Sequence, residues 1–231
     1  LRDWVDLDVM RAAPIGLQLL GTMDDYVADY FENPKLRQIM QYTLVFLGGA
    51  PTNTPAIYNM MSHVDFNLGV YYPENGLQSV VDACVELGEG MGVEYVTGAE
   101  VTEAGAFDAD YVVSNADYAH TERELLPEHE RQYDDDYWES RTYSPSAFLL
   151  YLGVEGDVEP LEHHTLVLPT DWDPHFEQIF DDPAWPEDPA YYLCVPSKTD
   201  DSVAPEGHSN LFALVPIAPG LDDTEAVRTW Y

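Results

Sequence analysis

Apolar residues at helical spacing predict that the first third of the chain is helical. Asn33 and Pro34 supply a cap residue and a proline at the first helical position, and Thr54-Pro55 repeats this start signal before residues 57–61. A helix that begins at Pro34 is expected to end at Gly48-Gly49. The apolar positions that carry the pattern are Leu19, Leu20, Met23, Val27, Tyr30 and Phe31, followed by Leu36, Ile39, Met40, Leu44 and Leu47 on the inward side.

The middle of the chain alternates strands with one helix. Residues 69–76 predict a strand and a turn, residues 93–101 a second strand, and residues 111–113 a third. A strand, helix, strand order is typical of an α/β sheet. The helix, at residues 77–92, places its apolar side chains on one face before a glycine stop: Leu77, Val80, Val81, Cys84 and Leu87.

Four further strands are predicted in the last third, with one short helix at residues 175–180. Their wide spacing and their aromatic and aliphatic content favour one mixed sheet with an unusually apolar face. The whole pattern predicts an α/β fold with α+β character. The strand candidates are residues 147–154, 163–169, 190–196 and 210–219.

The amino-acid composition argues against some classes of function. The chain has 43 Asp and Glu residues against 9 Lys and Arg, a formal net charge of −34. Such a field repels nucleic acids and anionic lipid headgroups, which argues against DNA or RNA as a partner. Acidic tails occur as blocks, whereas the longest run here is Asp134-Asp135-Asp136 and the other acids are dispersed. Dispersion favours a surface adapted to high salt, where screening relieves self-repulsion.

Neither the cysteines nor the apolar runs indicate an oxidising compartment or a membrane span. Cys84 lies in the apolar face of a predicted helix and is expected to be a core residue, so nothing demands a disulfide with Cys194. We expect no leader sequence at the start of the chain, and no apolar run in it approaches the ~20 residues that span a bilayer. We therefore expect a cytoplasmic protein that is at most peripheral to a membrane.

His163-His164 is the most obvious candidate for a metal site. Neighbouring residues on a strand point to opposite faces, so the two imidazoles are not expected to share one ion, and no metal site is predicted. One ring would pack inside while the other meets solvent or a cofactor pocket. Residues 88–92 look like a phosphate loop, but they end a helix instead of opening one, which favours a helix C-cap.

Two further positions have unusual surroundings. Arg37 lies in an otherwise apolar helix, where a lone cation needs a partner or a function, although exposure on the polar helix face explains it equally well. Residues 114–117, Ser-Asn-Ala-Asp, follow a predicted strand at the edge where ligands of α/β sheets bind, and their small size lets a cofactor approach the backbone. An Asx-rich turn would give the same pattern.

Seven segments carry a family resemblance when they are taken in order. They are YFENPKLRQ, GGAPTNTPAIYNMM, GVYYPENG, SNADYAHTERELL, SPSAFLLYLGV, LEHHTLVLP and YYLCVPSKTDDSVAPEGHSNLFALVP. The ordered set, with its HHT and APEG motifs, resembles the bacterial-type phytoene desaturase family of carotenoid desaturases. The acidic bias is similar to that of a haloarchaeal member.

The resemblance implies an FAD-dependent enzyme that removes hydrogen from adjacent saturated carbons of a long isoprenoid, phytoene or a later carotene. Such a substrate is recognised through an apolar channel. The resemblance also implies four parts: a helical region that faces substrate and membrane (residues 1–68), part of a Rossmann-like FAD-binding domain (69–120), a substrate-binding mixed sheet with covering helices (121–219), and the start of a following segment (220–231).

Site residues are carried over from the resemblance position by position. Arg37 matches an arginine near the flavin and the channel, which gives it a catalytic role as the group that orients substrate or cofactor. The cofactor-binding positions, beside the adenine and at the SNAD motif, are Val101, Ser114, Asn115, Ala116 and Asp117. The substrate channel is expected to include Phe148, Tyr151, His163, His164, Thr165 and Phe212.

The chain departs from the family pattern in three places, which is typical of a partial protein. The family's first Gly-x-Gly-x-x-Gly unit and its C-terminal region are not found in the 231 residues, and residues 102–106 stand where the family has a β-hairpin. The helix N-terminus that binds the FAD pyrophosphate would then be missing. We therefore expect this chain by itself to bind FAD weakly or not at all.

Three alternatives stay open. A carotenoid isomerase or a 3,4-type desaturase would use the same fold, and a non-enzymatic binder of apolar isoprenoids would lack the cofactor half. Carotenes partition into bilayers, so peripheral contact with the inner face of a membrane is also expected. The apolar helices of residues 17–62 would serve either as the docking surface or as a cover for the sheet.

Overall fold

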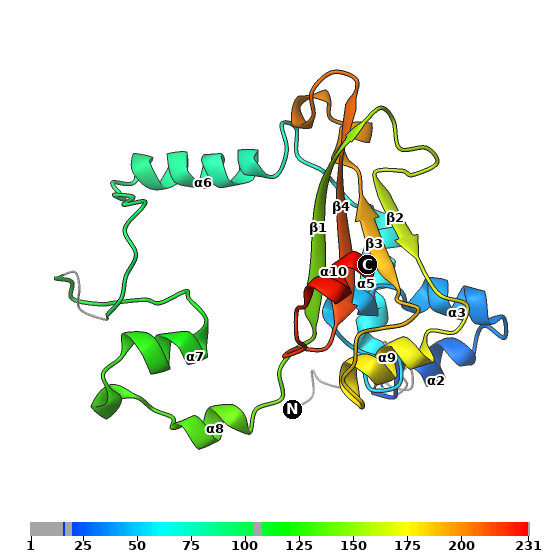
Figure 1. Ribbon diagram of the computed structural model, residues 1–231, viewed down its shortest axis with the longest axis horizontal. Helices are drawn as coiled ribbons and strands as arrows, with labels where there is room; N and C mark the ends of the chain where they lie inside the picture. Colours follow the sequence, from blue (N-terminus) through cyan, green and yellow to red (C-terminus); the bar gives the residue numbers. More distant parts are fainter. Residues whose placement is uncertain (1–15, 17–19, 104–107, 231) are drawn as a thin grey trace, which may run out of the picture. The chain divides into compact units, whose positions relative to one another are not determined.

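The computed structural model describes residues 16, 20–103 and 108–230 (Figure 1). The chain divides into two compact units: unit 2 consists of residues 81–143, and unit 1 of the residues on either side of that range. The predicted contribution of Leu19 and most of the connection at residues 102–106 lie outside the described residues.

Short helices with side-chain caps begin unit 1. Asn33 accepts a hydrogen bond from the Lys35 N–H at 2.9 Å and so caps α3, in which Pro34 is the first residue. Thr22 caps α2 through the Asp25 N–H at 3.1 Å. The elements are α2 Met23–Ala28, α3 Pro34–Gln41, α4 Leu44–Leu47, the 3-10 turn Ala56–Tyr58, α5 Asn59–His63 and the π turn Val64–Leu68.

The single helix predicted from residue 34 to residue 48 is interrupted by a turn between α3 and α4. α4 ends at Gly48, whose φ of 68° lies in the left-handed region that favours glycine. The inward side of α3 also differs from the prediction, because Leu36 and Ile39 are 45% and 47% exposed. Gln38 and Gln41 are buried instead. Both side-chain amides form hydrogen bonds, described below, which offset the free-energy cost of burying them.

Two small apolar clusters hold unit 1 together. One joins α2 to α4 through the fully buried Met23 and Leu44. The other joins α4 to α9, Asp173–Phe180, which confirms the short helix predicted at residues 175–180. The second cluster consists of Val45, Ala50, Trp172 and Phe176, with Leu168 and Phe180 packed against it.

The four strands predicted in the last third form one sheet, with strand order β1-β4-β3-β2 (Figure 1). All three pairs are antiparallel, where mixed directions were expected. β1 and β4 pair along their whole length, from Ser146↔Ile217 to Glu155↔His208. The strands are β1 Ser146–Glu155, β2 His164–Val167, β3 Tyr191–Cys194 and β4 His208–Ile217; 3-10 turns at Pro196–Lys198 and Asp201–Val203 precede β4, and α10 Glu225–Trp230 follows it.

Unit 2 contains helices without a sheet among its described residues. Its aromatic residues form a small cluster, in which the rings of Tyr133 and Tyr137 stack at 3.8 Å and the Trp138 ring lies 5.1 Å from that of Tyr137. The helical segments are α6 Gln78–Gly90, which begins three residues before the unit, α7 Tyr118–His120, the π turn Thr121–Leu125, the 3-10 turn Glu128–Glu130 and α8 Asp135–Glu139.

The three strands predicted in the middle of the chain are not formed. Residues 69–76, 93–101 and 111–113 are not assigned to any strand, and Tyr111 and Val113 are 91% and 92% exposed. A strand needs a neighbour that satisfies its backbone groups, so an apolar extended segment without one stays outside a sheet.

The helix predicted at residues 77–92 does form, as α6, but its apolar face is not covered. No residue of α6 is buried, and Leu87 is 67% exposed. The prediction that Cys84 is a core residue is therefore wrong, because the described residues leave it exposed. Residues 88–92 end the helix as predicted, and the Val93 N–H donates to the Gly88 carbonyl at 2.9 Å.

Candidate functional site

The strand register places aromatic and apolar side chains in rows on one face of the sheet. Tyr151 pairs with Phe212, Phe212 with Cys194, and Cys194 with His164, so these four side chains cross the sheet on the same face. The next row on that face is Leu149, Leu214, Tyr192 and Leu166. We call these eight residues the apolar face.

A line of aromatic rings continues from the apolar face onto the helices of unit 1. The Phe46 ring of α4 lies 5.5 Å from Tyr192, in an edge-to-face contact. The other steps are Tyr151 to Phe212 at 5.2 Å, Phe212 to Tyr192 at 6.3 Å, Phe46 to Tyr42 at 6.4 Å and Tyr42 to Phe66 at 6.1 Å. We call these six residues the aromatic line.

Much of the aromatic line is open to solvent. Tyr151 is 76% exposed, Phe46 48% and Phe66 52%. Tyr151 and Phe212 also line a pocket of about 660 Å³ at one end of β1 and β4. A long exposed row of aromatic rings is unusual on a protein surface, and a patch of this kind is suited to binding an apolar partner.

The predicted channel residues divide between the two faces of the sheet. Tyr151, Phe212 and His164 share the apolar face, as described above. Phe148 and Thr165 alternate with them and lie on the opposite face, where the Phe148 ring is 5.9 Å from Trp185. The side chains of Phe148 and Thr165 therefore belong to a different environment.

The expectation that His163 and His164 point apart is wrong. β2 begins at His164, so His163 lies before the strand and is not bound by its alternation. The two ring centroids are 4.3 Å apart. Burial, followed by the neighbouring His164, lowers the pKa of His163, so its imidazole is neutral near pH 7. Both rings line a pocket of about 610 Å³ with Tyr72 and Thr199.

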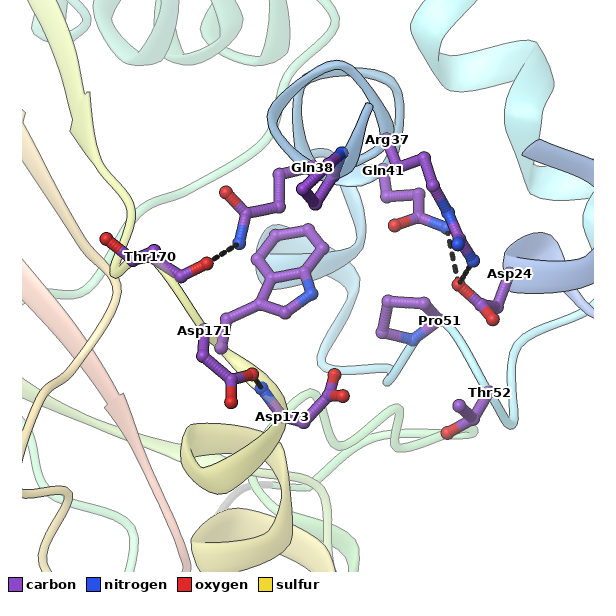
Figure 2. Close-up of a pocket in the computed structure, with 11 residues that line it drawn as sticks. Asp24, Arg37, Gln38, Gln41, Pro51, Thr52, Thr170, Asp171 and Asp173 are labelled. Atoms are coloured by element: carbon purple, nitrogen blue, oxygen red, sulfur yellow. Dashed lines mark hydrogen bonds and ion pairs between the residues drawn. The ribbon is translucent and has the colours of Figure 1, made fainter. Parts of the chain in front are cut away.

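Arg37 lines a separate, polar pocket of about 310 Å³ (Figure 2). Its guanidinium forms an ion pair with Asp24 at 2.7 Å, and Gln41 donates to the same carboxylate oxygen at 3.2 Å. Across the pocket, the Gln38 amide donates to the carbonyl oxygens of Pro169 at 3.1 Å and Thr170 at 3.3 Å. Arg37, which the sequence analysis singled out as a cation in need of a partner, is thus paired with Asp24, and none of the predicted channel residues lines this pocket.

The predicted cofactor residues all lie in unit 2. The Ser114 hydroxyl is 2.7 Å from that of Thr121, and Asp117 caps α7 by accepting a hydrogen bond from the His120 N–H at 2.9 Å. Asn115 and Ala116 are exposed, and Val101 is 43% exposed. This accessible turn of small residues fits the approach of a planar ring system. Among the described residues, no strand runs into a glycine loop that opens a helix, so these residues fit only part of an FAD site.

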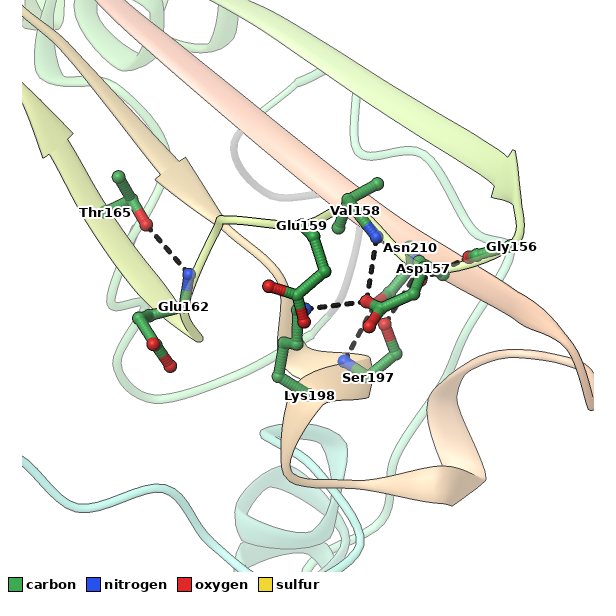
Figure 3. A network of polar contacts seen from close by, with 10 residues as sticks. Gly156, Asp157, Val158, Glu159, Glu162, Thr165, Ser197, Lys198 and Asn210 are labelled. Carbon is green, nitrogen blue, oxygen red and sulfur yellow. Dashed lines mark hydrogen bonds and ion pairs between the residues drawn. The ribbon is translucent and has the colours of Figure 1, made fainter.

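A polar network fixes the loop between β1 and β2 (Figure 3). Lys198 forms ion pairs with Asp157 at 2.6 Å and Glu159 at 3.4 Å. The Ser197 N–H donates to the Asn210 side chain at 3.0 Å, which ties the same turn to β4. These contacts hold the segment that leads to His163 and His164.

Sequence reasoning missed several residues of the apolar face and the aromatic line. Tyr192 and Cys194 alternate within a predicted strand, so their shared face was readable, but their partners on β4 depend on a register that the sequence does not contain. Phe46 and Phe66 come from helices, and only the tertiary packing brings them into line with Tyr192.

Comparison with known proteins confirms the resemblance seen in the motifs. The chain belongs to the carotenoid desaturases, a family of oxidoreductases. Carotenoid 3,4-desaturase of Haloarcula japonica is 72% identical to it over 245 aligned residues, which cover 100% of this chain and 50% of that protein. The acidic composition fits this haloarchaeal relative.

More distant relatives have the same kind of name. The zeta-carotene-forming phytoene desaturase of Myxococcus xanthus is 31% identical over 85% of this chain and 41% of its own length. The lycopene-forming phytoene desaturase of Pantoea ananas is 30% identical over 91% of this chain and 46% of its own length. The chain thus spans about half the length of the curated relatives it matches. No protein-family model matches the chain.

Proposed function

We propose that the protein desaturates a long isoprenoid of carotenoid biosynthesis, phytoene or a later carotene, with FAD as the electron acceptor. The similarity of the whole chain to the Haloarcula japonica carotenoid 3,4-desaturase carries this proposal. From the dispersed acidic residues we infer that the enzyme works at high salt, where its surface charges are screened.

The aromatic line is the proposed substrate surface. A carotene has no polar handle, so its affinity comes from buried apolar area, at about 25 cal/mol per Å². Rings at spacings of 5.2 to 6.4 Å offer a continuous apolar track for a rod-like polyene. Two of the predicted channel residues, Tyr151 and Phe212, belong to this track, and His164 borders it on the apolar face. The side chains of Phe148 and Thr165 lie on the other face of the sheet.

The proposed cofactor contacts are Val101 and residues 114–117 in unit 2. Ser114 and Ala116 are small enough for the backbone to approach the adenine end of FAD, and Asp117 fixes the turn through its cap on α7. When bound, FAD would supply the hydride-accepting chemistry of the desaturation. Because the described residues supply no pyrophosphate loop, we expect this chain by itself to bind FAD weakly or not at all.

Arg37 is proposed to orient substrate or cofactor. Its ion pair with Asp24 leaves the two side chains about a third exposed, at 30% and 35%. A guanidinium held by one carboxylate still has N–H groups that can meet a further acceptor. Arg37→Lys would keep the charge and lose the fixed fork of donors, so a fall in turnover without a loss of fold would support this role.

The 3,4-type reaction is the favoured form of this activity, because the Haloarcula japonica relative that carries that name is 72% identical. The test is a product assay with the full-length protein, purified at high salt and supplied with phytoene, later carotenes and hydroxylated carotenes. A flavin spectrum and new double bonds in a late carotene are expected.

Each other result of that assay has a defined meaning. If new double bonds form only in phytoene, the activity is phytoene desaturation and not the 3,4-type reaction. A change of double-bond geometry without loss of hydrogen would identify an isomerase. Tight carotene binding without flavin or turnover would identify a binder and overturn the proposal.

Peripheral membrane contact is proposed through the helices of residues 17–62. No helix among the described residues is long and apolar enough to cross a bilayer. The apolar side chains that α3, the 3-10 turn and α5 leave exposed are suited to lie at the boundary of headgroups and acyl chains: Leu36, Ile39, Ile57 and Met60. The cytoplasmic leaflet is the proposed side. Liposome flotation at high salt tests the contact, and full-length protein that stays in the bottom fraction would refute it.

A further inference from the structure

Three side chains on the apolar face and beside it bring metal-ligand atoms together. One ring nitrogen of His163, one of His164 and the Sγ of Cys194 lie within 4.8 Å of one another. His164 and Cys194 are directly paired across β2 and β3. The Val195 N–H donates to the His163 carbonyl at 2.8 Å, which makes His164 and Cys194 the adjacent, non-hydrogen-bonded pair, whose side chains approach most closely.

Hydrogen bonds orient both imidazoles. The Nδ1 of His163 lies 2.6 Å from the Thr199 hydroxyl, and that hydroxyl donates to the Pro196 carbonyl at 3.4 Å. A Thr199 hydroxyl that donates to Pro196 accepts from Nδ1–H, and the tautomer with its proton on Nδ1 has its lone pair on Nε2. The Nδ1 of His164 lies 2.6 Å from the Tyr192 hydroxyl. Partners of this kind fix the rings of metal-binding histidines and set their tautomers.

The Nε2 atom of His163 is buried, and no residue that the structure describes forms a hydrogen bond with it. An uncompensated buried polar atom costs free energy, and a ligand that takes its lone pair would recover that cost. The ring is further held by Tyr72, whose ring centroid lies 4.9 Å away in an edge contact.

We propose that His163, His164 and Cys194 bind one zinc ion, with a fourth position left for water. Two imidazoles and a thiolate are ligands that suit zinc, whereas calcium and magnesium prefer oxygen ligands. Three protein ligands with an open fourth position are the arrangement of an accessible zinc site. Binding exchanges the S–H bond of Cys194 for an S–Zn bond, and the proton passes to solvent.

The distances require a small adjustment. Zn–N bonds of about 2.0 Å and Zn–S bonds of about 2.3 Å in a tetrahedron separate the ligand atoms by roughly 3.5 Å. The ligand atoms lie up to 4.8 Å apart, so the largest separation between them must shorten by about 1 Å when zinc binds. The exposed side chain of His164 supplies this movement, and its hydrogen bond to the Tyr192 hydroxyl adjusts with it. The strongly negative surface also raises the local concentration of cations.

The test is cobalt titration of the full-length protein without a histidine tag, under reducing conditions and high salt. Cobalt(II) takes zinc sites and absorbs in the near ultraviolet when a thiolate binds it. Carboxylates on the acidic surface give no such band. We expect one equivalent of cobalt to produce the band and zinc to displace it.

Variants assign the ligands. Cys194→Ser should abolish the band, and Cys84→Ser, which removes the exposed second cysteine of the described residues, should keep it. His164→Gln should weaken binding by more than the roughly 10–100-fold that follows the loss of an outer partner, and Thr199→Val by about 10-fold. Near-ultraviolet circular dichroism checks each fold, and His164→Gln decides the matter if Cys194→Ser does not fold. A band that is absent from the wild type, survives in Cys194→Ser or disappears in Cys84→Ser overturns the proposal.

Discussion

Replacing His175 with leucine should remove a large part of the pH dependence of stability between about pH 4 and 6.5. His175 lies in α9 and is 2% exposed, and within the described part of the chain neither of its ring nitrogens has a hydrogen-bond partner. Burial lowers its pKa from 6.5 to about 4, and the nearby Asp188 opposes this only in part. The imidazole is therefore neutral in the folded protein at neutral pH.

The sign and size of the effect follow from this pKa. Between pH 6.5 and about 4 the unfolded chain binds a proton at His175 and the folded protein does not, so stability falls as the pH falls. The difference between the two values corresponds to roughly 3 kcal/mol. That is a large share of the 5–15 kcal/mol that typically stabilises a protein.

The assay is denaturant unfolding of wild type and variant at several pH values and constant high salt. The many carboxylates make both proteins acid-sensitive, but their contribution cancels in the difference between the two unfolding free energies. We expect the stability of the wild type relative to His175→Leu to drop by about 3 kcal/mol from pH 7 to pH 4.

A second replacement provides the control. His175→Phe differs in volume from His175→Leu, so the two variants should differ by an offset that does not depend on pH. Both should lose the same pH-dependent component. Equal slopes for the wild type and both variants between pH 6.5 and 4 would refute the reasoning, because His175 would then titrate alike in the folded and unfolded states.

Three other predictions test the sheet and the two polar sites. Phe212→Leu breaks the aromatic line and should weaken carotene binding about 10-fold in a fluorescence-quenching titration, whereas Phe148→Leu, on the other face, should leave it unchanged. Gln38→Leu leaves backbone carbonyl oxygens near α3 without their donor and should lower the unfolding free energy by about 1–3 kcal/mol in denaturant; no change would show that water replaces the amide. Lys198 lowers the pKa of Asp157, so the stability from this pair is present above the ordinary pKa of the carboxyl group and is lost as the pH falls through the lowered one. Lys198→Met should remove that component in low-salt unfolding scans, and an effect that persists at high salt would contradict an ion-pair origin.

The elements of unit 1 were largely predictable because their signals are local. Cap residues and proline marked the start of α3, and runs of aliphatic and aromatic residues marked all four strands. The register was not predictable, because the pairing of Tyr151 with Phe212 and of Cys194 with His164 arises only when distant strands meet.

The failures share a physical cause. Residues 93–101 and 111–113 have the composition of strands, yet a strand forms only when a neighbour accepts its hydrogen bonds. α6 has an apolar face, yet Cys84 is exposed because the described residues do not cover that face. A local sequence pattern predicts which face of a helix or strand is apolar. It does not show whether another element covers that face.

The candidate site was only partly predicted, because local sequence patterns do not reveal tertiary contacts. His163 and His164 were singled out from the sequence, but the rule of alternating faces failed because β2 starts between them. The resemblance supplied Tyr151 and Phe212. Phe46 entered the aromatic line only through its contact with Tyr192, which no sequence spacing indicates.

The central proposal is that the full-length protein transfers hydrogen from a carotene to a flavin. The most direct measurement is a single-turnover reaction of the full-length protein with a carotene, without oxygen, in which flavin absorbance and polyene absorbance are followed together at high salt. The account predicts that one flavin is bleached for each new double bond, as the polyene band moves to longer wavelength. A polyene band that moves while the flavin stays oxidised, or a flavin that never responds to the carotene, would contradict it.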